Sequence, residues 1–313
     1  MKEIKIFSGS SHPALAEKIC QQLGISLSPL KIKKYANGCF EVILGDNVCD
    51  KMVFLIQTSL PDLCCLHRNL WEFLQMINAS SKAGAEETIA VMPYISYARS
   101  DKIYTLGMTI SGELLVKLLE TSGIKRFVGI DFHSKEFGNF FSNKVKVYHS
   151  STESLIAKYL EMKNLGNAII LPGDKGAFKG ASSLAKKLKV PVGFVKKIRI
   201  SDTKARIVRI SVEVAGKDVV FFDDEISPVA TTLTTLGKEL EKRGAKSLMA
   251  IVTHASITHR TVLRLQQLNK ILKEIVVTDT VPISREAMEC LPVKVLSVAE
   301  LLAQTIRRIS GEK

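Results

Sequence analysis

Aromatic residues are scarce in this chain of 313 residues: Phe, Trp and Tyr make up 6% of it, and there is one Trp. Proteins that hold single-stranded nucleic acid depend on aromatic side chains on which the bases stack. We therefore do not expect base stacking to be the main activity. Long apolar runs are also lacking, since none approaches the ~20 residues that a membrane-spanning helix needs.

Targeting and metal-binding patterns are missing as well. The first 20 residues have the pattern of a short strand and a helix rather than that of a signal peptide. Cysteines stand at positions 20, 39, 49, 64, 65 and 290, without the paired spacing of a zinc site. The adjacent Cys64 and Cys65 do not suit an ordinary disulfide. We expect reduced thiols in a soluble, cytoplasmic protein that has no membrane attachment.

Positive charge is what the chain has in excess. Lys and Arg number 44 against 31 Asp and Glu, which gives a formal net charge of +13. Such a balance suggests anionic partners, namely phosphorylated metabolites, nucleic acid or acidic membranes. The charge alone does not choose among them.

Strand-like and helix-like patterns alternate along the whole chain, which is typical of parallel sheets covered by helices. With 46% hydrophobic residues, the chain is long enough for two domains with complete cores. We predict the α/β class. The predicted strands span residues 4–7, 52–57, 88–92, 126–131, 168–171, 192–195, 207–214 and 219–223, and the predicted helices include 13–24, 63–79, 110–120 and 176–188.

One segment of the chain has a partial repeat. Residues 118–133 can be laid over residues 239–254 with six identities, which include Gly123 with Gly244 and His133 with His254. Units of helix, Gly and strand share composition in any case. The match still favours two similar domains related by duplication, with ligands between them. We place them at residues 1–147 and 148–313.

The segment Lys217–Leu233 has the strongest functional pattern. Four apolar residues typical of a buried strand precede Asp223 and Asp224, and apolar residues at helical spacing follow. In open α/β sheets, ligands bind where strands end and helices begin. Two adjacent carboxylates there can hold the two hydroxyls of a ribose, and a helix start suits a phosphate. The alternative is a solvated acidic strand end. The hydroxyl-bearing residues of the turn are Ser227, Thr231 and Thr232.

Three further features each give only a weak indication of function when they are considered separately. His133 follows a predicted strand, where a lone His is more often structural than catalytic. Asp174 lies in a Gly-containing turn with nearby lysines, but the full P-loop pattern is absent. The basic stretch 195–210 is either a solvated hairpin or a mobile loop that brings Lys197 and Arg199 onto a transferring phosphoryl group.

Six segments stand in this order along the chain: FSGSSHPALAEKI, MPYISYARSDK, ISGELLVKLLETSG, IDFHSKEFGNFF, THASITHRTVLRL and EIVVTDTVP. Through these segments, in the same order and with few length changes, the chain resembles the ribose-phosphate diphosphokinase (phosphoribosyl pyrophosphate synthetase) family from end to end.

The resemblance implies two phosphoribosyltransferase-like α/β domains, each a mainly parallel sheet flanked by helices. It also implies a magnesium-dependent enzyme of nucleotide biosynthesis. The enzyme would transfer the diphosphoryl group of ATP to the C1 hydroxyl of ribose 5-phosphate and release AMP. A homo-oligomer, hexameric or dimeric, is the expected assembly.

The resemblance also implies roles for individual residues. The family's catalytic-loop Lys and Arg fall on Lys197 and Arg199, and its ribose-binding pair falls on Asp223 and Asp224. Magnesium would lie near His133 and Asp174. The expected ATP-binding residues are Tyr35, Asn37, Arg99, Ser100 and His133, and the expected ribose 5-phosphate residues are Asp223, Asp224, Ser227, Thr231 and Thr232.

The chain departs from the family pattern at several places. Cys39 stands where the family usually has Glu, and Ile103–Gly107 replaces a segment normally rich in charge. Pro228 replaces a usual Thr and has no N–H for a phosphate, whereas Ala230 replaces a usual Gly and resists a positive φ. Gly173 is an extra residue between Pro172 and Asp174. These departures motivate one alternative, a non-catalytic regulatory homologue that binds active synthetase or nucleotides. The net charge of +13 motivates another, a nucleic-acid-binding protein, although anionic substrates explain that charge equally well.

Overall fold

The computed structural model describes residues 3–60, 65–201 and 204–311. Within these ranges, the side chains of residues 135, 197–201, 204–206 and 208 lie outside the description, and those of Lys197 and Arg199 are among them. The chain forms two compact units. The first comprises Met1–Ser151, Thr280–Pro282 and Val298–Lys313, and the second comprises Thr152–Asp279 and Ile283–Ser297. The domain ranges 1–147 and 148–313 stay a prediction.

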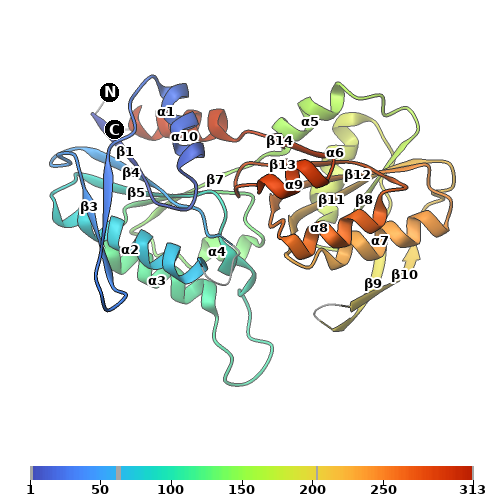
Figure 1. The fold of residues 1–313 in the computed structure, drawn as a ribbon, viewed down its shortest axis with the longest axis horizontal. Helices are drawn as coiled ribbons and strands as arrows, with labels where there is room; N and C mark the ends of the chain where they lie inside the picture. The colour runs from blue at the N-terminus through green and yellow to red at the C-terminus, as the bar shows by residue number, and fades with distance from the viewer. Residues whose placement is uncertain (1–2, 61–64, 202–203, 312–313) are drawn as a thin grey trace. The chain divides into compact units, whose positions relative to one another are not determined.

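The first unit is built on a five-stranded parallel sheet in the order β1-β4-β5-β6-β7. Helices α1 (Pro13–Leu23) and α10 (Ala299–Gly311) cover one face, and α2 (Leu66–Lys82) and α3 (Ser111–Ser122) cover the other (Figure 1). Covered on both faces, β4 is buried at every position, as expected for a parallel sheet. The strands are β1 (Ile4–Ser8), β4 (Met52–Ile56), β5 (Glu87–Met92), β6 (Arg126–Ile130) and β7 (Lys146–Ser150).

The second unit repeats this plan with the sheet β8-β11-β12-β13-β14, again parallel throughout. Helices α5 (Glu153–Glu161) and α6 (Phe178–Leu188) lie on one face, and α7 (Thr231–Lys242) and α8 (His259–Leu265) lie on the other (Figure 1). Alternate residues of the internal strand β11 enter two separate cores. The strands are β8 (Ala168–Pro172), β11 (Asp218–Ile226), β12 (Ser247–Ala255), β13 (Leu272–Thr278) and β14 (Val293–Leu296).

Each unit carries an antiparallel hairpin at the same place in its chain order. In the first unit, β2 (Leu30–Lys34) pairs with β3 (Phe40–Leu44) between α1 and β4. In the second, β9 (Val195–Ser201) pairs with β10 (Lys204–Ile210) between α6 and β11. Short helices complete the described chain: η1 (Ser96–Arg99), α4 (Lys135–Asn139), η2 (Gln266–Leu268) and α9 (Arg285–Cys290).

The predicted fold class, two mainly parallel α/β sheets flanked by helices, is confirmed. The register of the partial repeat was wrong. By sheet order, α7 and β12 correspond to α2 and β5, whereas the sequence overlay matched them with α3 and β6. Correspondingly, His254 lies inside β12 and is buried, while His133 lies beyond the end of β6 and is exposed.

Several predicted boundaries were also wrong. The strand β11 continues through the three acids to Ile226, because Glu225 and Ile226 still pair with β12. The strand predicted at 207–214 ends at Ile210 in the hairpin, and Val192 forms only an isolated bridge. The predicted helix 63–79 begins at Leu66 in the structure, and its first two predicted residues lie outside the described part of the chain.

Two predictions about composition can be compared with the structure. None of the helices in the described ranges is long and apolar enough to cross a membrane. Of the five described cysteines, none forms a disulfide, and Cys64 lies outside the described part. Burial raises the pKa of the Cys20 thiol to about 11, so this thiol stays protonated at neutral pH.

Candidate active site

The carboxyl end of β11 carries the predicted ribose-binding pair. Asp223 is buried and Asp224 is half-buried, because successive residues of a strand face opposite sides of the sheet. The Asp224 N–H donates to Asp223 Oδ1 over 3.0 Å. The strand lies inside the sheet between β8 and β12, and its carboxyl end belongs to the edge where α/β sheets bind ligands.

A tight turn joins β11 to helix α7. The Ala230 N–H donates to the Ser227 carbonyl over 2.8 Å, and Ala230 adopts φ 47° and ψ 35°. This is the left-handed conformation, which costs a residue with a Cβ roughly 1–2 kcal/mol. Ala230 thus adopts the positive φ that it resists and that a Gly would adopt without strain. Successive N–H groups in such turns form concavities that bind anions.

The first residue of α7 holds an oxygen without a partner. The Thr231 hydroxyl is buried, and no hydrogen-bond partner for it exists among the residues that the structure describes. A buried hydroxyl without a partner destabilises a protein by about 1–3 kcal/mol. It lies beside the first-turn N–H groups of the helix, which have no acceptor within the helix. This arrangement is typical of a place that a ligand with acceptor oxygens completes.

The neighbouring helix α8 contacts this turn. The Thr261 hydroxyl donates to the Pro228 carbonyl over 2.7 Å, and the Thr258 hydroxyl lies 3.3 Å from the same oxygen. Thr258 and Thr261 form the capping box of α8. We did not predict these residues from the sequence, although two hydroxyl residues three positions apart before an apolar run are a known helix-start pattern.

The turn after β8 carries Asp174. Its Oδ1 accepts N–H groups from Gly176 at 2.8 Å and Ala177 at 3.1 Å, so the carboxylate also shapes the turn that leads into α6. The extra residue Gly173 has a packing reason. A Cβ at this position would lie 2.0 Å from Asp223 Oδ2. The Asp223 carboxylate thus occupies the space that any larger residue at position 173 would need.

The basic stretch forms a hairpin rather than an irregular loop. In the backbone pairing, Lys197 is opposite Ile207 and Arg199 is opposite Ala205. The hairpin precedes β11, so it belongs to the same unit as Asp174 and Asp223. The predicted catalytic roles of Lys197 and Arg199 depend on side chains outside the described part of the chain.

In the first unit, the turn between β2 and β3 carries Tyr35 and Asn37. The Tyr35 hydroxyl donates to Glu41 over 2.5 Å, and Lys33 lies 4.9 Å above its ring. Asn37 Oδ1 accepts the N–H of Cys39 over 3.1 Å, so it helps to shape the turn itself. Tyr35, Asn37 and Cys39 are all exposed. Their side chains are accessible to a ligand from solvent.

The segment after β5 carries Arg99 and Ser100. Arg99 is exposed at the end of the short helix η1. The Ser100 hydroxyl accepts the Ser111 N–H over 2.9 Å and so stabilises the start of α3. Between them and α3 lies an exposed apolar segment, in which Tyr104 is 74% exposed and Leu106 is fully exposed. The segment thus presents apolar surface to solvent.

His133 follows the end of β6 in the first unit. The chain turns at Asp131, whose φ is 38°, and Ser134 then caps the short helix α4 by accepting the Phe137 N–H. His133 lies between these two residues and is exposed. It is therefore accessible to solvent three residues beyond the end of β6.

Magnesium prefers oxygen ligands and is usually held by one or two carboxylates together with substrate phosphates. No group of three or more His, Cys, Asp or Glu side chains that could hold a metal occurs in the described ranges. Asp174 fits a cation that arrives with phosphates. An imidazole suits softer metals better than magnesium, so His133 fits this role less well.

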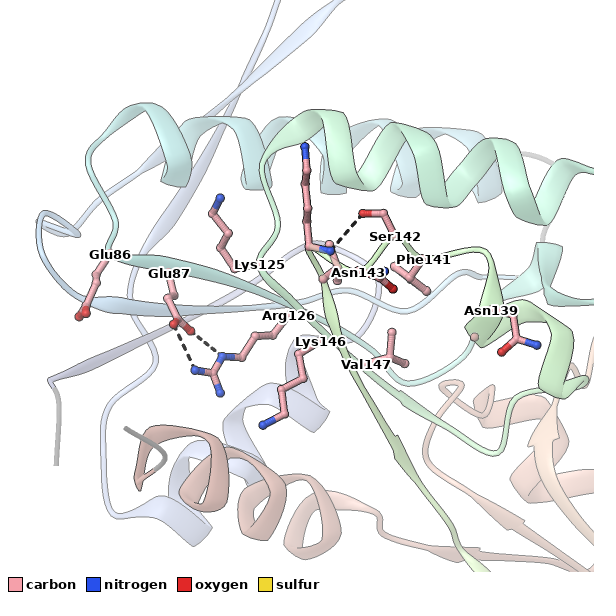
Figure 2. A pocket seen from close by; sticks show the side chains of 13 residues that line it. Glu86, Glu87, Lys125, Arg126, Asn139, Phe141, Ser142, Asn143, Lys146 and Val147 are labelled. Atoms are coloured by element: carbon pink, nitrogen blue, oxygen red, sulfur yellow. Dashed lines mark hydrogen bonds and ion pairs between the residues drawn. The ribbon is translucent and has the colours of Figure 1, made fainter.

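A cavity of about 910 Å³ lies elsewhere in the first unit, at the amino ends of β5, β6 and β7 (Figure 2). Arg126 points at Glu87 and forms two hydrogen bonds of 2.6 and 3.1 Å, which raise its pKa. Lys125 and Lys146 point to opposite sides (Figure 2). The cavity includes none of the predicted site residues, and its cationic groups do not converge on one point.

Family models match most of the chain. Residues 4–123 match the N-terminal domain of ribose phosphate pyrophosphokinase, and residues 195–313 match the phosphoribosyl synthetase-associated domain. The second match includes the hairpin β9–β10, the acidic end of β11 and the turn into α7.

Relatives match over nearly their full length. The ribose-phosphate pyrophosphokinase of Porphyromonas gingivalis is 35% identical over 98% of this chain and 95% of its own. That of Helicobacter hepaticus is 33% identical over 99% and 96%. The crystal structure of phosphoribosylpyrophosphate synthetase from Mycobacterium smegmatis superposes with a TM-score of 0.89 at 29% identity, over 99% of each chain. The chain therefore belongs to the ribose-phosphate pyrophosphokinase family and is an enzyme of that type.

Proposed function

We propose that this enzyme transfers the diphosphoryl group of ATP to the C1 hydroxyl of ribose 5-phosphate, and so forms phosphoribosyl pyrophosphate and AMP. The observation that carries the proposal is the buried, unpartnered hydroxyl of Thr231 at the start of α7, next to the acidic end of β11. A sugar phosphate matches both features, because its phosphate accepts hydrogen bonds and its hydroxyls donate them.

The 5-phosphate lies at the turn between β11 and α7 in this proposal. The first-turn N–H groups of α7, the Thr231 hydroxyl and the positive end of the helix dipole all favour a dianion there. Ser227 and Thr232 supply further hydroxyls. Asp223 and Asp224 accept hydrogen bonds from the ribose hydroxyls and so orient the C1 hydroxyl for attack.

ATP binds in our proposal through the residues of the first unit. Tyr35 and Asn37 contact the adenine side, and Arg99, Ser100 and His133 contact the nucleotide further along. Asp174 would be the protein ligand of magnesium, which would neutralise charge on the phosphates. A role of His133 in holding the metal stays a prediction.

The transfer step forms a bond between the C1 oxygen and the β-phosphorus and breaks the bond from that phosphorus to the oxygen that remains on AMP. Negative charge is spread over the oxygens of the transferred group in the transition state. Lys197 and Arg199 stabilise that charge when the hairpin β9–β10 closes on the substrates. This role agrees with their place next to β11 in the chain.

The direct test uses the purified chain alone. AMP formation from ATP is measured with and without ribose 5-phosphate, and with and without magnesium. We expect AMP in equal amount to phosphoribosyl pyrophosphate and only when all three components are present. Binding of the substrates without any AMP would contradict the proposal and would favour the non-catalytic regulatory alternative. The homo-oligomer, a hexamer or a dimer, stays a prediction, and light scattering measures the number of subunits. The cytoplasmic location also stays a prediction.

A further inference from the structure

In the turn between β11 and α7, which is the proposed phosphate site, one peptide group is fixed by a hydrogen bond from helix α8. The peptide group between Pro228 and Val229 presents the Pro228 carbonyl and the Val229 N–H, whereas the preceding peptide group has no N–H because residue 228 is a proline. The carbonyl accepts the Thr261 hydroxyl over 2.7 Å. Among residues 3–60, 65–201 and 204–311, the Val229 N–H has no hydrogen-bond acceptor.

The hydrogen bond from Thr261 determines which way this peptide faces. In a planar trans peptide, the carbonyl and the N–H point in opposite directions. Since the Pro228 carbonyl points at α8, the Val229 N–H points away from α8. The peptide could rotate if its carbonyl were released, because the residues around it belong to a turn and not to a strand or helix.

The position of Thr261 makes it a rigid donor. Its side chain is fully buried, and its oxygen also accepts the Thr258 N–H over 3.1 Å in the capping box of α8. A hydroxyl has one proton to donate. Of the two carbonyls within reach, Pro228 at 2.7 Å is closer than Ser256 at 3.3 Å, so the proton goes to Pro228.

We propose that Thr261 is a positioning residue for ribose 5-phosphate: through the Pro228 carbonyl it directs the Val229 N–H at the 5-phosphate. This inference rests on the proposed function, because it assigns a further donor to the same site. It also accounts for a working turn that contains Pro228 and Ala230. The Val229 N–H gives the turn one directed donor next to the proline, and the Ala230 N–H donates to the Ser227 carbonyl.

The test compares the variants Thr261→Val and Thr261→Ser. Val keeps the shape and loses the hydroxyl, whereas Ser keeps the hydroxyl. We expect Thr261→Val to weaken the binding of ribose 5-phosphate, measured by calorimetry without ATP, by about tenfold, the worth of one hydrogen bond to a charged group. The Michaelis constant for ribose 5-phosphate should rise by a similar factor at nearly unchanged kcat, and Thr261→Ser should restore both.

A matched control separates positioning from general destabilisation. The buried Thr278 hydroxyl also donates over 2.7 Å to a backbone carbonyl, that of Thr253. Thr278→Val should therefore cost similar stability and leave the binding of ribose 5-phosphate unchanged. Equal binding by Thr261→Val and wild type, or equal weakening by Thr261→Val and Thr278→Val, would overturn the inference.

Two other cases can be decided as well: a Thr261→Val variant that does not fold, and a wild type that forms no AMP. If Thr261→Val does not fold, amide hydrogen exchange of the wild type at Val229 decides: slower exchange with ribose 5-phosphate supports the inference, and unchanged exchange overturns it. If the wild type binds ribose 5-phosphate but forms no AMP, the proposed reaction fails. The dissociation constants of the variants then still decide the role of Thr261.

Discussion

Gly173 and Asp223 are in such close contact that no Cβ fits between them. A Cβ on Gly173 would lie 2.0 Å from Asp223 Oδ2 and 3.0 Å from the ring of Phe221. Gly173 follows β8 and Asp223 lies near the end of β11, so two neighbouring strands bring them together. The placement of one carboxylate of the proposed ribose site thus depends on the absence of a side chain on the adjacent strand.

We therefore expect Gly173→Ala to displace the Asp223 carboxylate. The predicted result is a loss of about 1–3 kcal/mol in the free energy of unfolding, the usual effect of overpacking, with a raised Michaelis constant for ribose 5-phosphate. Urea denaturation and steady-state kinetics measure the two effects. Gly166→Ala is the matched control in the same unit, because a Cβ there meets its nearest atom at an ordinary 3.4 Å. If both variants behave like the wild type, the proposed placement is wrong.

Substitutions at Pro228 and Ala230 should improve the binding of ribose 5-phosphate rather than weaken it. Changing Pro228→Thr and Ala230→Gly together adds an N–H and a hydroxyl and removes the left-handed strain at position 230. We expect the Michaelis constant for ribose 5-phosphate to fall roughly tenfold, the worth of one charge-assisted hydrogen bond. The measurement is made at saturating ATP and magnesium. An unchanged constant in an active enzyme would mean that the turn already reaches full affinity without these groups.

Lys197 is expected to matter only in the transition state. Lys197→Ala should lower kcat by several orders of magnitude, since cationic groups contribute about 10³–10⁵ in comparable phosphoryl transfers. The melting temperature should change little. The neighbouring Lys196, which is exposed, gives the control Lys196→Ala with near-normal turnover. A Lys197→Ala enzyme with near-normal kcat would remove this residue from the proposed mechanism.

Asp174 should determine the magnesium concentration that the reaction needs. Asp174→Asn removes the charge and keeps an oxygen that can accept the N–H groups of Gly176 and Ala177, so the turn should stay intact. We expect the magnesium concentration at half-maximal rate to rise several-fold, as it should for His133→Ala. The rate is titrated with magnesium at constant ATP. An effect of Asp174→Asn alone would leave His133 as an ATP contact, whereas full activity in excess chelator would contradict the cation requirement.

The sequence predicted the features that are continuous in the chain. The acids of β11, the hydroxyl residues of the turn and the start of α7 follow one another within Lys217–Leu233, so one pattern of burial and polarity revealed them together. The hairpin β2–β3 also had a pattern in part, since apolar and charged residues alternate over the first four residues of β2 and the first three of β3. That alternation was overlooked because the strands are short and half-exposed.

Contacts between distant parts of the chain could not be predicted in this way. The approach of Gly173 to Asp223 follows from the pairing of β8 with β11, and the bond from Thr261 to Pro228 follows from the packing of α8 beside the turn. Neither arrangement has a local sequence pattern. The roles of Lys197 and Arg199 rest on the resemblance of their segment to the family. They stay predictions, because both side chains lie outside the described part of the chain.

The most direct test of the account compares Thr231→Val with the wild type in two quantities, the dissociation constant of ribose 5-phosphate and the free energy of unfolding. In the free protein the Thr231 hydroxyl is buried and has no partner in the described part of the chain, so its removal should stabilise the fold by about 1 kcal/mol or more. In the complex it should donate to the phosphate, so binding should weaken at least tenfold. A variant that is more stable and binds more weakly is the predicted result. Unchanged binding of ribose 5-phosphate would contradict the central claim that the start of α7 receives the phosphate.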